Sequence, residues 1–263
     1  MKLPRIGTAL AFGFLALLGL STVAGNAEAA PPWVDRGITL PQGIWTFDLG
    51  LGVARRAENV TGSGVNFDLA VGLSQDLALG FRTGARFGDR YRWVQADERG
   101  RLYDTQTYGT GVDSLANPEL TLRYRFVDAE IPEVGVESRL ILPVESGTRL
   151  GVLVGLPVAL HFGSLRLDSG VFLPVLFYDP VFTSLSVPVK LWIQPTSKVF
   201  LGPIADLRWQ NQNDRTSFLL GFGFGYSFAR AADFKVQTLF PSITETAGAR
   251  DVSFGVGVQL RIE

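Results

Sequence analysis

The chain holds 263 residues with a formal net charge of −1, no cysteine and one histidine. The lack of cysteine excludes a disulfide framework, and a charge near zero provides no argument for binding nucleic acid. With one histidine, no cysteine and no calcium-loop string, we expect no metal site and no other cofactor.

The first 30 residues are typical of a secretory signal peptide. Two basic residues precede a short apolar core over residues 10–20, and the small-residue triplet at 27–29 favours cleavage after residue 29 or 30. The core is short for a membrane-spanning helix. The chain is therefore expected to comprise a signal peptide (1–30), a periplasmic N-terminal lead (31–42) and a β-barrel (43–263).

After the lead, apolar residues alternate with polar residues and glycines. The first strand is predicted at 43–55, and the clearest alternation follows in two runs, 65–73 and 77–87, joined around Gln75-Asp76. Alternation at period two places the two sets on opposite faces, and so short a turn indicates an antiparallel hairpin. Each run is long enough to cross a bilayer at a tilt, with lipid on the apolar face and a lumen on the other.

The connection 88–117 is the longest, and it shows no sustained period. Loops of this length are usually functional or disordered, and this one is a candidate constriction of the lumen. Alternation then returns in nine further segments. These predicted strands are 119–126, 134–144, 150–162, 165–177, 185–193, 199–209, 217–228, 234–240 and 252–262.

The pattern predicts an all-β fold, an antiparallel up-and-down transmembrane barrel of about twelve strands in the bacterial outer membrane. Short connections at 75–76, 163–164 and 195–198 are expected at the periplasmic end, and longer ones at the outer end. Prolines at 143, 157, 174, 188 and 203 lie inside predicted strands, where they interrupt a hydrogen-bond ladder, so we expect bulges or kinks there.

Two sequence segments resemble those of a known family. They are NPELTLRYRF at 117–126 and SRLILPVESG at 138–147. They are similar to the outer-membrane transporter barrels linked to the MetA pathway of phenol degradation, a resemblance that covers about the middle third of the chain. It implies uptake or transport, with no catalytic residue to carry over. The ending Arg261-Ile262-Glu263 departs from the terminal Phe or Trp common for recognition by the assembly machinery.

The inner face of the predicted barrel is charged. Two readings are open: a narrow water-filled pore with mild anion preference, since bases outnumber acids, or charges that pair and close the lumen. The predicted lumen-lining residues are Asp48, Asp68, Arg82, Arg86, Glu119, Arg123, Arg125, Glu137, Arg139, Arg166, Asp168, Lys190, Asp206, Arg208, Lys235 and Arg261.

The function expected is an outer-membrane channel or transporter that passes small solutes and contacts lipid and the outer-membrane assembly machinery. The alternative is a closed structural or adhesive barrel whose loops bind partners. An outer-membrane enzyme is disfavoured, because the only histidine, His161, lies three residues before Ser164 at the predicted periplasmic end. The acidic pair Asp97-Glu98 in the long loop is a further, weaker candidate for chemistry, and no catalytic residue is assigned.

Overall fold

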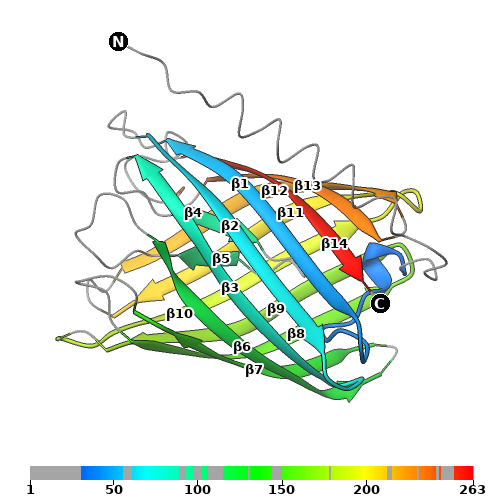
Figure 1. Cartoon of the computed structure of the whole chain (residues 1–263), viewed down its shortest axis with the longest axis horizontal. Helices are drawn as coiled ribbons and strands as arrows, with labels where there is room; N and C mark the ends of the chain where they lie inside the picture. The colour runs from blue at the N-terminus through cyan, green and yellow to red at the C-terminus, as the bar shows by residue number, and fades with distance from the viewer. Residues whose placement is uncertain are drawn as a thin grey trace, which may run out of the picture.

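The computed structural model is a closed barrel of twelve antiparallel strands (Figure 1). The structure describes residues 31–55, 61–88, 93–96, 102–105, 115–129, 131–143, 150–177, 179–211, 215–229, 231–240, 243 and 252–262. The barrel strands are β1 (Trp45–Arg55), β2 (Thr61–Gly72), β3 (Leu77–Gly88), β6 (Leu115–Asp128), β7 (Glu133–Ile141), β8 (Gly151–Phe162), β9 (Leu165–Leu176), β10 (Phe182–Ile193), β11 (Val199–Gln210), β12 (Arg215–Ala229), β13 (Ala232–Phe240) and β14 (Val252–Ile262).

Each strand of the barrel pairs with its neighbour along the chain, except where β3 pairs with β6. The barrel closes between β1 and β14 in unbroken register from Trp45↔Ile262 to Arg55↔Val252. Closure gives each of the twelve barrel strands a neighbour on both sides, which lipid requires because it offers no hydrogen-bond partners. The predicted fold class and the number of strands are confirmed.

The outer surface of the barrel is apolar, as the alternation predicts. Large apolar side chains stand exposed at every second position, for example along β12, where Phe222, Phe224, Tyr226 and Phe228 are 48%, 38%, 39% and 47% exposed. An exposed apolar surface that runs round a whole molecule is suited to a membrane. No helix among the described residues is long and apolar enough to span a membrane.

One end of the barrel carries only short turns, and we call it the short-turn end. Its connections are 73–76, 129–132, 163–164, 194–198 and 230–231. The connection after β6 is shorter than predicted, because β6 extends to Asp128 and β7 begins at Glu133. All five turns therefore obey the expected alternation of short and long connections.

The long connection between β3 and β6 contains structure that the sequence did not predict. β4 (Trp93–Ala96) and β5 (Leu102–Thr105) form a two-stranded hairpin (Figure 1). β4 contacts β14. The four-residue strands are too short to show a period, which is why they were missed. Asp97 and Glu98, the loop pair considered for chemistry, lie outside the described residues, as does the expected signal peptide.

Glycines on the inner wall make room for large side chains that lie flat against it. A Cβ on Gly225 would overlap the ring of Phe200 on the neighbouring β11, and one on Gly223 would lie 2.6 Å from the Trp192 ring. Phe172 covers Gly155 in the same way. The glycine repeat of β12 therefore forms a smooth inner surface on which aromatic rings from β10 and β11 rest.

Candidate functional site

The first group of lumen charges crosses four neighbouring strands, β2, β3, β6 and β7. Arg82 pairs with Asp68 at 3.5 Å and faces Glu119 across the β3–β6 ladder. Arg139 binds Glu119 at 2.8 Å and Glu137 at 2.6 Å, and Glu137 also binds Arg123 at 2.8 Å. All of these side chains except Asp68 are buried. Because each buried charge has a partner of opposite sign, the cost of removing it from water is offset.

A second group lies on β9, β10 and β11. Arg166 binds Asp168 at 2.7 Å, and the fully buried Lys190 is paired in register with Asp168. Asp206 binds Arg208 at 2.7 Å and accepts a hydrogen bond from Ser186 at 2.7 Å. This group also alternates in sign along the wall, so base and acid are adjacent throughout.

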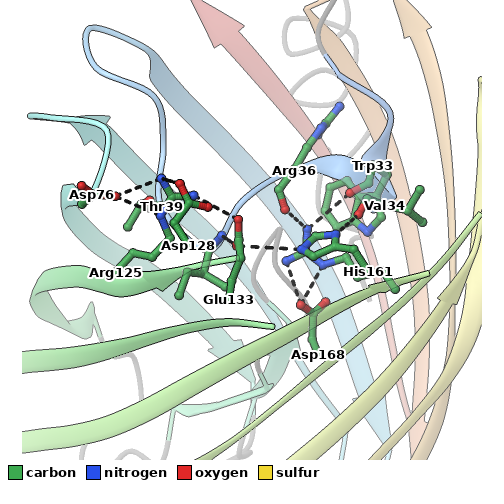
Figure 2. Close-up of polar contacts among 12 residues, drawn as sticks. Trp33, Val34, Arg36, Thr39, Asp76, Arg125, Asp128, Glu133, His161 and Asp168 are labelled. Carbon is green, nitrogen blue, oxygen red and sulfur yellow. Dashed lines mark hydrogen bonds and ion pairs between the residues drawn. The ribbon is translucent and has the colours of Figure 1, made fainter. Parts of the chain in front are cut away.

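The other predicted lumen residues lie near the barrel seam or at the short-turn end. Lys235 binds Asp48 at 2.7 Å across β13 and β1. Arg125 binds the acids Asp76, Asp128 and Glu133 at 3.0 Å each (Figure 2). Arg261 is half-buried on β14, and Arg86 pairs through its backbone with Gly64, its side chain lying outside the described residues. That these residues form a solute path stays a prediction.

The short-turn end of the lumen is occupied by the chain itself. Residues 33–40 follow the expected cleavage point and begin with a 3-10 turn, η1 (Trp33–Asp35). Trp33, Val34, Ile38, Thr39 and Leu40 are all buried, with 1–3% of each exposed. We call residues 33–40 the plug segment; none of it belongs to a strand of the barrel.

Side chains of the wall hold the plug segment by its backbone. Gln194 accepts a hydrogen bond from the Val34 N–H at 3.0 Å, and Glu133 accepts one from the Ile38 N–H at 2.7 Å. In the other direction, three wall residues donate to its carbonyl oxygens. His161 donates to Val34 at 2.5 Å (Figure 2). Arg123 donates to Ile38 at 3.2 Å, and Arg166 donates to both Trp33 and Arg36.

Two side chains of the plug segment add specific contacts. The Trp33 ring stacks on Phe200 with centroids 4.4 Å apart and planes 1° apart, and the Trp192 ring meets it edge-on at 5.8 Å. Arg36 binds Asp233 at 2.5 Å and Gln259 at 3.2 Å, and its guanidinium lies 5.0 Å from the Trp33 ring centroid. The plug segment is thus bound by ring stacking, an ion pair and backbone hydrogen bonds together.

The predicted lumen set held only charged residues inside predicted strands, and it omitted five polar wall residues that bind the plug segment. His161 and Gln259 lie inside predicted strands, and the other three lie just outside them. Glu133, Gln194 and Asp233 each lie one residue beyond a predicted strand limit, at a position whose parity points inward. They were missed because the limits were drawn at outward apolar residues. Extending the alternation by one residue finds all three. Glu133 and Asp233 also reduce the predicted excess of bases over acids.

His161 has a structural partner in this arrangement. Its Nδ1 donates to the Val34 carbonyl, and its Nε2 lies 3.9 Å from a Glu133 oxygen (Figure 2). One ring nitrogen therefore contacts the plug segment itself, and the other points at Glu133, which also binds the segment. Among the described residues, no group of His, Asp and Glu is arranged to hold a metal ion.

Comparisons with known proteins support the fold, but they do not show which family the chain belongs to. No protein-family model matches the chain, and no curated protein matches it. The resemblance to the transporters of the MetA pathway is therefore not confirmed.

Solved outer-membrane channels share the architecture. The KdgM porin has a TM-score of 0.55 and 9% identity over 83% of this chain and 99% of that chain. The NanC porin has a TM-score of 0.56 and 11% identity over 82% and 100%. An outer membrane channel from Pseudomonas putida F1 has a TM-score of 0.58 and 13% identity over 87% and 99%. The chain therefore has the fold of bacterial outer-membrane channels, and this fold agrees with the predicted location.

Proposed function

We propose that the protein is an outer-membrane channel for small solutes, with a charged lumen whose short-turn end is closed by the plug segment. The observation that carries this proposal is the way the segment is held. Side chains of the wall bind it, and it pairs with no strand, so it can leave while the barrel stays intact. Removing it uncovers the paired charges behind it.

The charged side chains of the inner wall indicate the class of solute. Arginines, lysine and carboxylates line the lumen in alternation, which suits polar or charged solutes better than apolar ones. Bases outnumber acids in the predicted set, which supports mild anion preference, although Glu133 and Asp233 reduce that excess. The KdgM porin, which shares the fold, has been solved with oligogalacturonate, and the resemblance to the MetA-pathway transporters supports uptake.

Single-channel conductance tests the proposal. The folded wild-type barrel is compared in a planar bilayer with Trp33→Ala and with a chain lacking residues 31–40. Truncating a buried tryptophan removes about 3–5 kcal/mol of packing, which shifts the ratio of closed to open states by roughly a hundredfold or more. We expect rare small steps in the wild type and frequent, larger steps in both variants.

Asp35→Ala is the matched control, because Asp35 lies in the same turn and is exposed. It is expected to conduct like the wild type. The alternative, a closed barrel with a structural role, is supported by the burial of ten of the sixteen predicted lumen charges. If the chain lacking 31–40 folds and inserts without conducting, the channel proposal is wrong and the closed barrel stands. The test measures no enzymatic activity, because no catalytic residue is assigned in this site.

A further inference from the structure

The surface beneath Trp33 has the features of a binding site for a flat ring. Phe200 is fully buried and lies parallel to the Trp33 ring, while Trp192, 2% exposed, meets that ring edge-on. Phe200 rests in turn on Gly225, where there is no side chain to push it into the lumen. The wall therefore has a rigid aromatic floor and side that belong to the barrel and remain when the plug segment leaves.

A cation lies over the same ring. The Lys235 ammonium is 5.5 Å from the Trp33 centroid and is anchored by Asp48 at 2.7 Å. Ammonium groups within about 6 Å of an aromatic face are attracted by its electron-rich centre, most strongly with indole. The pocket thus favours an electron-rich ring over a saturated ring of similar size.

Arg166 supplies a directed donor beside the ring. Its Nε and Nη2 bind Asp168 at 2.8 and 2.7 Å, which orients the guanidinium, and its Nη1 donates to the Trp33 and Arg36 carbonyl oxygens. The side chain is 1% exposed. A carboxylate oxygen in place of these neutral carbonyls forms a charge-assisted bond, roughly twice as strong as a neutral one.

We propose that the Trp33 pocket is a solute site of the channel, that it takes an aromatic ring of indole size carrying a carboxylate, and that such a solute competes with the plug segment for it. Trp33 occupies the site as a ligand tethered in the same chain. Its ring fills the aromatic floor, and its own carbonyl fills the Arg166 position. The solute that displaces it also frees the short-turn end, so this inference rests on the proposed function.

The occupied site predicts a specific pattern of affinities. A tethered ligand competes at a high local concentration, so a free solute binds the wild type only in the fraction of molecules whose pocket is empty. Trp33→Ala removes the competing ring while leaving every barrel residue in place. Asp35→Ala leaves the ring bound and serves as the control.

The experiment is equilibrium dialysis of labelled N-acetyl-tryptophan against the purified folded protein in detergent. N-acetyl-tryptophanamide, which has the same ring and no charge, is the second probe. We expect Trp33→Ala to bind N-acetyl-tryptophan at least roughly tenfold more tightly than the wild type and Asp35→Ala do. We also expect Trp33→Ala to bind the acid roughly tenfold more tightly than the amide.

Each result decides a part of the proposal. No binding of either probe to folded Trp33→Ala overturns the site. Equal binding of acid and amide overturns the role of Arg166, and equal affinity of wild type and Trp33→Ala overturns competition with the plug segment. Because the readout is binding, it is independent of conductance: a silent barrel that binds the acid refutes the channel alone, and a conducting barrel that binds neither probe refutes the site alone.

Discussion

Replacing Glu137 by glutamine removes the carboxylate that two lumen arginines share. Arg123 donates to one Glu137 oxygen through Nε at 2.9 Å and Nη2 at 2.8 Å, and Arg139 donates to the other at 2.6 Å. Glu137 is fully buried. Glutamine has nearly the same shape, so the change leaves no cavity, but it replaces an acceptor oxygen by an amide group that itself donates.

The expected cost follows from these contacts. Removing one partner of a buried ion pair costs about 3–5 kcal/mol, because the remaining charge is left buried without compensation. We therefore expect Glu137→Gln to lower the free energy of unfolding by about 3–5 kcal/mol. Asp128→Asn is the control: Asp128 binds Arg125 at 3.0 Å, but its side chain is 59% exposed. Exposed pairs contribute about 0–1 kcal/mol.

The assay is equilibrium unfolding of the barrel in urea, in lipid vesicles, followed by tryptophan fluorescence. Heat-modifiable migration on a gel verifies that each variant is folded at the start. A cost for Glu137→Gln no larger than that for Asp128→Asn would refute the reasoning. It would mean that water in the lumen screens these charges, and it would favour an open pore over a lumen closed by ion pairs.

Three further predictions follow from the wall and from the lipid-facing surface. Gly225→Ala places a methyl group against the Phe200 ring, so we expect unfolding free energy to fall by about 1–3 kcal/mol in the same urea assay. Leu122 lies in the middle of β6 and is 43% exposed, so we expect Leu122→Arg to lower the free energy of unfolding in vesicles by about 2–4 kcal/mol. Phe126 lies near the end of the same strand, and Phe126→Arg should lower it by only about 0–1 kcal/mol. Equal effects of the two changes would contradict the membrane placement. Arg208→Ala should shift the reversal potential of the opened channel towards cations, and an unchanged potential would argue against a role for this arginine in selectivity.

The plug segment and the aromatic floor beneath it connect the fold to its proposed function. The glycines of β12 let Phe200 and Trp192 lie against the wall, and Trp33 stacks on Phe200. The same wall carries the donors that hold the backbone of the segment. We therefore expect a side chain added at Gly225 to disturb the plug segment indirectly, by displacing the Phe200 ring on which Trp33 stacks.

The sequence by itself determined the twelve strands of the barrel and which face of each of them meets lipid. Alternation at period two is a local property, because successive side chains in a strand point to opposite faces whatever the partner strand is. The last strand was predicted at 252–262 and is observed there. The inner positions of Glu137, Lys190 and Asp206 follow from the same parity. Strand ends were less well predicted, and so Glu133, Gln194 and Asp233 were missed.

Only the tertiary structure decided what fills the lumen. The plug segment binds Glu133, His161, Gln194 and Gln259 across 95, 127, 160 and 223 residues of sequence. These wall residues come together only when the barrel closes, so no local pattern in the lead 31–42 reports them. The Trp33 pocket likewise combines β9, β10, β11 and β13, whose inner residues meet around one ring because closure brings separate strands to a common axis.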